Sequence, residues 1–259
     1  MIHPLANIHP DAKIGQNVKI DPFTNIYADV EIGDNTWIGS NVTIFDGARI
    51  GSNCQIYPGA VISAVPQDLK YKGERTFTEI GNNTSIRECV TINRGTTDRM
   101  TTKVGDNCLL MAYSHVAHDC FVGNNVIMAN MATLAGHITV EDWAILEGLV
   151  VVQQFVTIGA HAFVTGTSKV RKDIPPFVKA AKDPLCYAGV NVVGLRRRGF
   201  SDERIKNIED LYRIIYVRGY NMTRALEIVG AELPDSAEKS QIVDFIKSSQ
   251  YGVIKGMID

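Results

Sequence analysis

Histidine and aspartate stand next to each other in this chain at His118 and Asp119. A neutral imidazole beside a carboxylate can take up a proton near neutral pH, so this pair is a candidate general base with its orienting group. The positions of Asp119 and His137 differ by eighteen, as do those of Gly136 and Gln154. If a span of that length makes one turn of the fold, these groups stack into one polar cluster; otherwise they are solvated surface residues.

The same region offers a second chemistry, because His115, His118 and His137 could supply three nitrogen ligands to a zinc ion. His115 and His118 stand on either side of Val116, however, which argues against their converging on one ion. No cysteine joins the three histidines. We therefore predict acid–base chemistry here and no metal.

A repeat of six residues must position these groups. Every sixth residue from Ile2 to Val170 is apolar, apart from Asp68, Glu74 and Asp98, and the residue four positions further on is usually small. A period of six is neither helical nor that of an alternating sheet, and it fits a short strand followed by a corner. Three such units close a triangular coil of about 18 residues, and coils stack about 4.8 Å apart in a parallel β-helix.

Corners and insertions interrupt the strands. Glycine often follows the apolar register residue, as at Gly33, Gly51 and Gly81, and we expect glycine, asparagine and aspartate there to supply the positive φ of tight corners. Residues 63–79 and 94–103 break the register, which then resumes in phase. They are predicted to be loops that leave an intact prism, and such insertions often carry a binding face.

The repeat stops after Val170, and the period becomes helical from Ser201 onward. Ser201 followed by two acidic residues is a helix start signal, and two further helical stretches are expected near 223–229 and 236–248. The predicted organisation is a β-helix over residues 1–190 and a helical domain over residues 191–259, which covers the open end of the β-helix.

Composition narrows the classes of function. The 259 residues include 45% hydrophobic residues and carry a net charge of −2, which fits a folded protein and argues against a dedicated nucleic-acid binder. No apolar stretch is long enough to cross a bilayer, and no secretory signal is visible at the N-terminus. Five cysteines without paired spacing suit a reducing compartment, so we expect a cytoplasmic protein without membrane insertion.

Several strings make the chain resemble one family, the UDP-N-acetylglucosamine O-acyltransferases that begin lipid A synthesis, within the hexapeptide-repeat acyltransferases. The strings run through the repeat and into the helical tail. They are Gln67-Asp-Leu-Lys-Tyr71, Ile86-Arg-Glu-Cys-Val-Thr-Ile92, Asn93-Arg-Gly-Thr96, His115-Val-Ala-His-Asp-Cys120, Ala132-Thr-Leu-Ala-Gly-His137 and Gly194-Leu-Arg-Arg-Arg-Gly-Phe200. The resemblance implies a left-handed parallel β-helix, mainly β, with a C-terminal α-helical domain.

The resemblance also implies a reaction. His118 takes the proton from the glucosamine 3-hydroxyl of UDP-N-acetylglucosamine, Asp119 orients His118, and the Gly136 N–H stabilises the oxyanion. The acyl donor is a long 3-hydroxyacyl chain on acyl carrier protein, and no covalent acyl-enzyme, metal or further cofactor takes part. The residues implied in positioning the sugar nucleotide are Asp68, Lys70, His115, His137, Gln153, Gln154 and Asn191. Arg197 and Arg198 are implied in contacts with phosphate or with the acidic carrier protein.

Two positions bear on specificity. Gly166 matches the site that limits acyl length in this family, and a glycine leaves room for a chain of fourteen carbons or more. Gln153 departs from the histidine that the family commonly has there, which keeps a 3-amino sugar nucleotide open as the acceptor. The family is homotrimeric, with active sites between neighbouring prisms, and this chain is expected to assemble likewise.

Other functions on the same scaffold stay open at this point. They are an acetyl-CoA-dependent acetyltransferase, a zinc-dependent hydratase and a non-catalytic β-helical binding module. The Gln67-Asp-Leu-Lys-Tyr71 string and the helical tail argue against the first two, and the stacked His118, Asp119 and His137 argue against the third.

Overall fold

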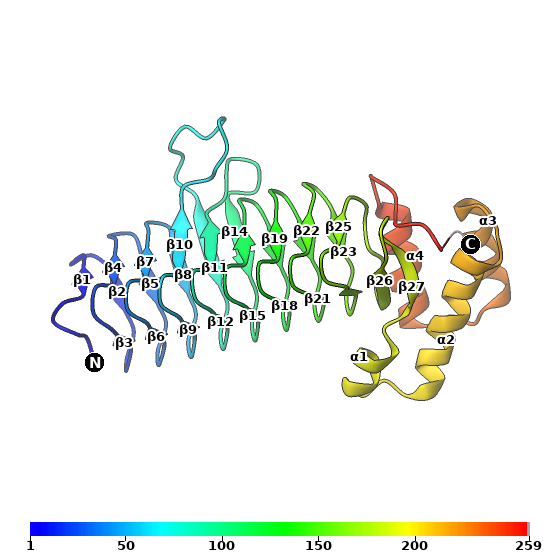
Figure 1. The fold of residues 1–259 in the computed structure, drawn as a ribbon, viewed down its shortest axis with the longest axis horizontal. Helices are drawn as coiled ribbons and strands as arrows, with labels where there is room; N and C mark the ends of the chain where they lie inside the picture. Colours follow the sequence, from blue (N-terminus) through cyan, green and yellow to red (C-terminus); the bar gives the residue numbers. More distant parts are fainter. Residues whose placement is uncertain (258–259) are drawn as a thin grey trace.

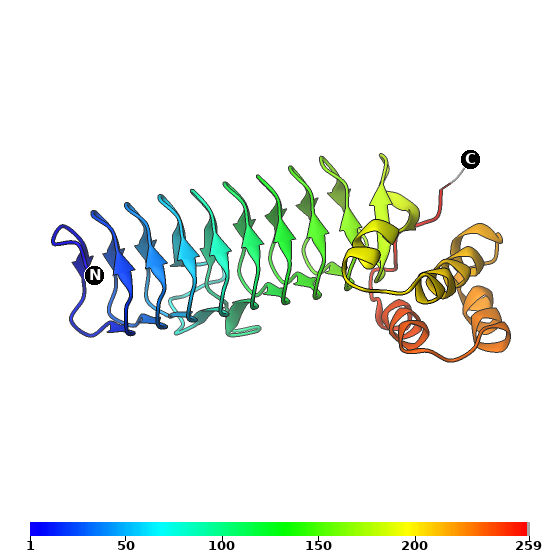
Figure 2. The same cartoon turned by 90° about the horizontal axis from the view of Figure 1, so that it is seen from below.

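The structure, a computed structural model, describes residues 1–257 as a long three-sided prism of short strands with helices at one end (Figures 1 and 2). Each coil contributes one strand to each of three sheets, and the strands within the prism pair in parallel. The predicted parallel β-helix followed by a helical region is confirmed.

The three sheets are named here by their first strands. Sheet 1 consists of β1 (Asn7–Ile8), β4 (Asn25–Ile26), β7 (Thr43–Ile44), β10 (Val61–Ala64), β13 (Thr91–Asn93), β16 (His115–Val116), β19 (Thr133–Leu134), β22 (Val151–Val152) and β25 (Lys169–Val170). Sheet 2 consists of β2 (Lys13–Ile14), β5 (Glu31–Ile32), β8 (Ala48–Ile50), β11 (Phe77–Ile80), β14 (Thr101–Val104), β17 (Phe121–Val122), β20 (Thr139–Val140) and β23 (Thr157–Ile158). Sheet 3 consists of β3 (Lys19–Ile20), β6 (Trp37–Ile38), β9 (Gln55–Ile56), β12 (Ser85–Ile86), β15 (Leu109–Leu110), β18 (Ile127–Met128), β21 (Ile145–Leu146), β24 (Phe163–Val164), β26 (Val178–Ala181) and β27 (Cys186–Val190).

The strand register follows the sequence period. His115 of β16 pairs with Thr133 of β19, three repeats of six further along the chain, as one full coil requires. Val61 of β10 pairs with Thr91 of β13, because the first insertion adds twelve residues, and Thr91 pairs with His115, because the second adds six. The insertions therefore lengthen two coils without shifting the residues that face inward.

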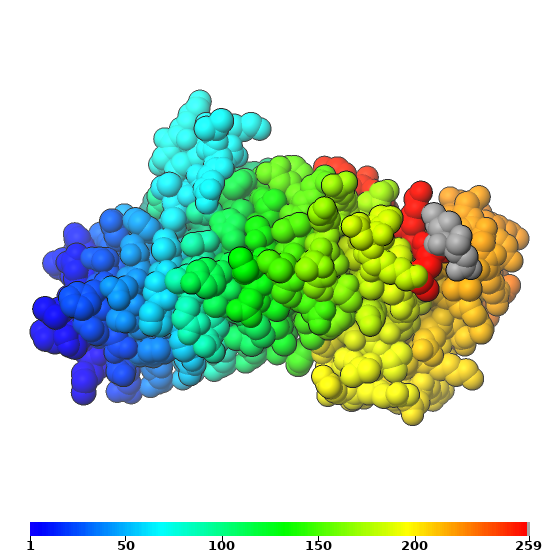
Figure 3. All heavy atoms as spheres, in the orientation of Figure 1, coloured from blue at the N-terminus to red at the C-terminus, as the bar shows by residue number. Residues whose placement is uncertain are grey.

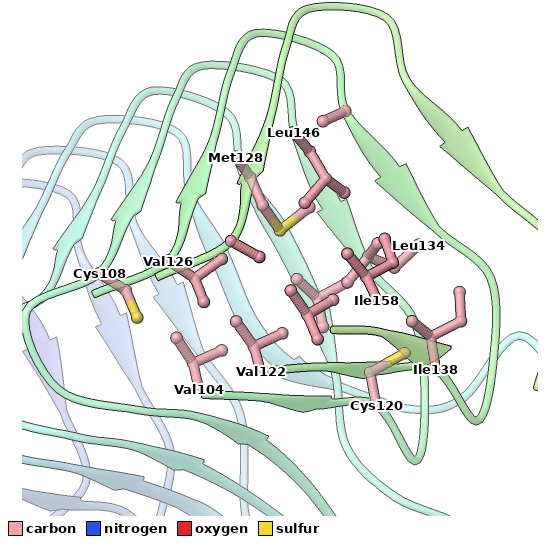
Figure 4. Close-up of a cluster of buried hydrophobic side chains, with 14 of the residues drawn as sticks. Val104, Cys108, Cys120, Val122, Val126, Met128, Leu134, Ile138, Leu146 and Ile158 are labelled. Atoms are coloured by element: carbon pink, nitrogen blue, oxygen red, sulfur yellow. The ribbon is translucent and has the colours of Figure 1, made fainter. Parts of the chain in front are cut away.

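The core is the column of register residues inside the prism. The second residue of most strands is buried, and members of the column such as Ile38, Ile44 and Leu110 are fully enclosed. Figure 4 shows how apolar residues of successive coils, including Val104, Val122 and Val126, fill the interior, with Cys108 and Cys120 at the small-residue positions. Stacking of like residues leaves the outward residues free to differ from coil to coil.

We predicted that the glycines after the register residues supply the positive φ of the corners, and this reason was wrong. The positive φ falls two residues later, at Asn35 and Asn53, not at Gly33 and Gly51. A Cβ built on Gly33 would lie 2.7 Å from the backbone carbon of Gly51 in the next coil. Glycine is needed there because adjacent coils approach closely, while asparagine tolerates the left-handed corner.

The helical region lies at the C-terminal end of the prism (Figure 1). It consists of α1 (Val192–Arg197), α2 (Asp202–Tyr212) running on into a π-helical turn (Arg213–Val217), α3 (Met222–Glu232) and α4 (Ala237–Ser248). Ser201 caps α2 by accepting a hydrogen bond from the Arg204 N–H, as the sequence predicts. No helix within residues 1–257 has the length and apolar character needed to cross a bilayer.

Candidate active site

The edge between sheets 1 and 2, called here the first edge, carries most of the predicted polar cluster. The chain turns this corner between β16 and β17, between β19 and β20, and between β22 and β23. His118, Gly136 and Gln154 therefore stand above one another in successive coils. The predicted stacking of one coil on the next is what brings them together.

His118 and Asp119 form a buried pair on this edge. Nδ1 of His118 lies 2.9 Å from Oδ2 of Asp119, and the two residues are 5% and 0% exposed. An ionised carboxylate can only accept, so the imidazole proton sits on Nδ1 and the lone pair on Nε2. This is the tautomer that a general base needs.

The second insertion closes over the carboxylate of Asp119. The Thr96 N–H donates to Oδ1 at 2.9 Å, the Thr96 hydroxyl donates to Oδ2 at 2.7 Å, and the Arg99 N–H donates to Oδ1 at 3.2 Å. Burial by itself raises the pKa of Asp119, but the hydrogen bonds from Thr96, His118 and Arg99 outweigh it and lower the pKa below its ordinary value. Asp119 therefore stays ionised and fixed in orientation.

Gly136 lies against the face of His118. A Cβ at this position would fall 2.6 Å from Cε1 and 2.8 Å from Nε2 of His118, so only glycine fits. Within residues 1–257 the Gly136 N–H has no backbone acceptor. A backbone N–H without an acceptor, on a residue packed against the imidazole, is a candidate oxyanion-binding donor.

His137 packs between aromatic neighbours on the same edge. Its ring meets His118 edge-on at a centroid distance of 5.0 Å and stacks on Phe155 at 4.7 Å. Oδ2 of Asp98 lies 2.9 Å from Nδ1 of His137 but off the N–H direction, so the contact is an ion-pair approach without an aligned hydrogen bond. The Asp98 carboxylate of the second insertion thus contacts the His137 ring.

The two insertions frame a hollow over this edge. A cavity of about 270 Å³ is lined by Asp68, Lys70, Asp98, His137 and Phe155, among others. The loop around Asp68 stands out from the prism (Figure 3). The structure therefore brings Asp68 and Lys70 to the predicted cluster, although they are far from it in sequence.

Three other predicted residues lie on sheet 1 or the first edge. His115 begins β16, and its Nδ1 lies 2.7 Å from the Thr91 hydroxyl; burial, only partly offset by Thr91, lowers its pKa. Gln153 and Gln154 are exposed at the corner after β22, one coil beyond Gly136. All three face the side of the prism on which the dyad stands.

Asn191, Arg197 and Arg198 lie elsewhere, near the edge between sheets 2 and 3, called here the second edge. Asn191 caps α1 through its Oδ1 and donates from Nδ2 to the His161 carbonyl at 2.9 Å, so both of its polar atoms are used within the chain. Nη1 of Arg198 lies 3.3 Å from Nδ1 of His161, and its guanidinium lies over the ring of Trp143. Arg197 is exposed.

His161 is held in an aromatic stack on the second edge, between Trp143 and Phe177. Burial, together with the charge of Arg198, lowers the pKa of His161 to about 4. The ring is therefore neutral at physiological pH, and its Nδ1 can accept a hydrogen bond from Arg198.

Gly166 lies on the remaining edge, between sheets 3 and 1, called here the third edge. Its N–H donates to Oε2 of Glu147 at 2.9 Å, and a Cβ there would approach the Gly148 carbonyl at 3.1 Å. The predicted site residues of one chain are thus divided among three edges of the prism.

The alternative zinc site considered from the sequence used His115, His118 and His137 as ligands. The structure brings a different set of possible ligands together. Ligand atoms of His118, Asp119 and His137 lie within 4.8 Å of one another, and His115 is not among them. Both oxygens of Asp119 already accept hydrogen bonds from Thr96, Arg99 and His118. This arrangement favours an orienting carboxylate over a metal ligand.

Sequence reasoning missed Thr96, Arg99, Trp143 and His161 as parts of the site. Thr96 stands in one of the strings that carried the resemblance, which was the available signal. The contacts of these four residues depend on the second insertion folding back and on α1 docking, and neither is visible in the six-residue period.

Comparison with known proteins agrees with this geometry. Residues 11–46, 29–64 and 101–136 match the bacterial transferase hexapeptide family, described by its six repeats. Fold and site thus define a hexapeptide-repeat transferase. Residues 173–254 match domain 2 of the UDP-N-acetylglucosamine O-acyltransferases.

Full-length relatives specify the family. The chain is 47% identical to an acyl-(acyl-carrier-protein)–UDP-N-acetylglucosamine O-acyltransferase of Janthinobacterium over 98% of this chain and 99% of the relative. The crystal structure of a UDP-N-acetylglucosamine acyltransferase from Bacteroides fragilis superposes with a TM-score of 0.97 at 51% identity, covering 98% of this chain and all of that one. The Francisella novicida enzyme gives a TM-score of 0.95 at 39% identity, covering 98% and 94%. The chain belongs to the UDP-N-acetylglucosamine O-acyltransferase family, the enzymes that begin lipid A biosynthesis.

Proposed function

We propose that this enzyme transfers a long 3-hydroxyacyl chain from acyl carrier protein to the glucosamine 3-hydroxyl of UDP-N-acetylglucosamine. Nε2 of His118 removes the hydroxyl proton as the oxygen attacks the thioester carbonyl. The Gly136 N–H stabilises the tetrahedral oxyanion, and collapse expels the pantetheine thiolate, which recovers the proton from His118. Asp119 holds the imidazole and balances its transient charge. No covalent acyl-enzyme, metal or further cofactor is needed.

One observation supports this proposal above the others. Nε2 of His118 lies close against the backbone of Gly136, since a Cβ there would fall 2.8 Å from that nitrogen, and the Gly136 N–H has no backbone acceptor within residues 1–257. A base and an unpaired backbone N–H on neighbouring residues suit an acyl group transferred directly between two bound substrates. A non-catalytic binding module would not need a base next to an unpaired N–H.

The sugar nucleotide is proposed to lie in the hollow framed by the two insertions. Asp68 and Lys70 contact the sugar there, and His115, His137 and Gln154 border it along the first edge. Arg197 and Arg198 contact a phosphate or the carrier, with Arg198 presented by Trp143 and His161. The Asn191 side chain uses both of its polar atoms in hydrogen bonds within the chain. We therefore propose that residues next to Asn191, and not its own side chain, contact the nucleotide.

A homotrimer is proposed because the site residues of one prism lie on three different edges. His118 is on the first edge, Arg198 on the second and Gly166 on the third. Neighbouring prisms packed side by side would bring unlike edges together and complete each site. We place the enzyme in the cytoplasm, where its five cysteines, all free in the structure, stay reduced.

A 3-amino sugar nucleotide is the second candidate acceptor, and Gln153 is the observation that favours it. An amine at the same carbon would give an amide in place of an ester, with His118 in the same role. Gln153 is exposed on the first edge, where an acceptor group can reach it.

The test is a transfer assay on the purified enzyme with both acceptors. Donors are 3-hydroxyacyl carrier proteins of ten to sixteen carbons and acetyl-CoA, and Gln153→His is assayed beside the wild type. We expect transfer from a long 3-hydroxyacyl carrier protein to the 3-hydroxyl acceptor. Transfer only from acetyl-CoA, or from none of the donors, would contradict the proposal, and preference for the amine would select the second candidate.

A further inference from the structure

Asp98, in the second insertion, is a carboxylate beside the dyad to which the proposed reaction gives no part. Its place is fixed by the residues around it in the chain. The backbone N–H groups of Thr96 and Arg99 both donate to Oδ1 of Asp119, at 2.9 and 3.2 Å. Because the chain is tied to this one buried atom on both sides of Asp98, the turn that carries Asp98 keeps a defined position next to the dyad.

The Asp98 side chain lies against His137, one coil beyond the dyad. Oδ2 of Asp98 is 2.9 Å from Nδ1 of His137, and the His137 ring meets that of His118 at a centroid distance of 5.0 Å. One ring therefore contacts both the proposed base and this carboxylate. The Asp98 side chain is nonetheless 63% exposed, and it lines the hollow of about 270 Å³ that the two insertions frame (Figure 1). A ligand in that hollow that reaches His118 can reach Asp98 as well.

Both carboxylate oxygens of Asp98 are free to accept hydrogen bonds. Asp68 and Glu74, the other carboxylates that line the hollow, each accept a hydrogen bond from a backbone N–H of their own loop, at 2.9 Å in both cases. Within residues 1–257 no N–H or O–H donates an aligned hydrogen bond to Asp98, since its contact with His137 lies off the N–H direction. An ionised carboxylate has about four lone-pair positions, so Asp98 can receive donors from a ligand.

Sugar hydroxyl groups suit this hollow. A hydroxyl can donate one hydrogen bond and accept others, and the hollow offers the Asp98 carboxylate as an acceptor and the Lys70 ammonium as a donor. An amide N–H could use only the carboxylate. In glucosamine the 4-hydroxyl stands on the carbon next to the one that bears the reacting 3-hydroxyl. When the 3-hydroxyl is at His118, the 4-hydroxyl is therefore the other hydroxyl of the sugar nearest to the base.

We propose that Asp98 accepts a hydrogen bond from the 4-hydroxyl of the acceptor sugar and thereby makes the enzyme select the configuration at that carbon. A hydrogen bond to a charged oxygen is stronger than a neutral one, and an acceptor whose 4-hydroxyl is inverted or missing loses it. Asp98 is then a specificity-determining residue next to the proposed base. This inference rests on the proposed function, because it takes UDP-N-acetylglucosamine as the acceptor.

The test pairs changes in the protein with changes in the acceptor. Wild type, Asp98→Ala and Asp98→Asn are assayed for kcat/KM with UDP-N-acetylglucosamine, its 4-deoxy analogue and its 4-epimer, with one 3-hydroxyacyl carrier protein as donor. We expect the wild type to prefer the natural acceptor by about tenfold to a hundredfold. Asp98→Ala should lose most of this preference, because kcat/KM falls for the natural acceptor and changes less than threefold for the deoxy analogue. Asp98→Asn keeps an oxygen acceptor and should retain part of the preference.

Asp11→Ala, which removes an exposed carboxylate near the N-terminus, is the matched control and should behave as the wild type. An equal loss with all acceptors in Asp98→Ala would overturn the proposal, because Asp98 would then act only by holding His137 or the loop. An Asp98→Ala enzyme with the full preference of the wild type would overturn it as well. Failure of the proposed function would show differently, as a wild type that transfers the acyl group to none of the acceptors.

Discussion

At the scale of single residues, the site depends on a carboxylate that is buried and yet ionised. Asp119 has no exposed surface, and its oxygens are held by two N–H groups, one hydroxyl and one imidazole. It also occupies a left-handed corner with φ of 59°, a conformation that aspartate tolerates better than most residues. The second insertion therefore fixes the carboxylate that partners the proposed base.

Thr96→Val tests this directly. The variant removes the 2.7 Å hydrogen bond to Oδ2 of Asp119 and leaves a similar volume, so we expect kcat to fall about tenfold, equivalent to about 1.4 kcal/mol. The KM for the sugar nucleotide should change little, because Thr96 is proposed to act through Asp119. Thr96→Ser keeps the hydroxyl and should restore most of kcat; equal loss in both variants would show a packing role only.

His161 gives a prediction for stability against pH. Its folded pKa of about 4 lies below the ordinary value of 6.5, so the unfolded state binds the proton first as pH falls. The contribution is complete above pH 6.5 and is lost between pH 6.5 and 4. We expect the Tm of the wild type to fall more steeply over this window than that of His161→Gln. Parallel pH profiles for the two proteins would refute the assignment.

At the scale of the structural elements, the six-residue period was sufficient to predict the strands. The apolar residue of each six-residue unit is the one that faces inward, so its position in the sequence marks the strand. Ile2 to Val170 therefore marked the prism, and Ser201 marked the start of α2. The insertions have no period, so the contacts of Thr96 with Asp119 and the approach of Asp68 to His137 could not be derived. The sequence also led to the wrong reason for Gly33, because the close approach of adjacent coils can be seen only in the stacked structure.

Gly33→Ala is expected to destabilise the prism. A Cβ would meet the backbone of Gly51 and Ser52 at 2.7 Å, and backbone cannot move aside as a flexible side chain can, so the cost should be about 2 kcal/mol or more. Gly230→Ala in α3 is the matched control, since nothing lies within 4 Å of its Cβ and helix propensity favours alanine. Thermal unfolding should separate the two in opposite directions, and a Gly33→Ala protein as stable as the wild type would contradict the close-approach account.

At the scale of the whole molecule, the proposed site residues of a single prism lie on three separate edges. The proposed catalytic pair of His118 and Asp119, Arg198 and the acyl-length candidate Gly166 lie on three different edges, although the sequence motifs predict one common site. Residues could be chosen from the sequence, but their distribution required the coil geometry. The proposed trimer explains why residues so placed would serve one reaction.

Complementation tests this division. His118→Ala and Arg198→Ala chains, each of low activity alone, are denatured together and reassembled at a 1:1 ratio. If each site takes His118 from one chain and Arg198 from its neighbour, one site in each mixed trimer is intact and activity returns to about a quarter of wild type. A mixture no more active than the mean of its parents would place both residues in one chain's site.

The most direct measurement of the central claim is kcat for His118→Ala with 3-hydroxyacyl carrier protein and UDP-N-acetylglucosamine. His9→Ala, on an exposed histidine near the N-terminus, is the matched control, and circular dichroism and oligomer mass verify both proteins. We predict a loss of about 10² to 10⁴ in kcat for His118→Ala and none for the control. A His118→Ala enzyme that keeps kcat within a few-fold of the wild type would contradict the assignment of His118 as the general base.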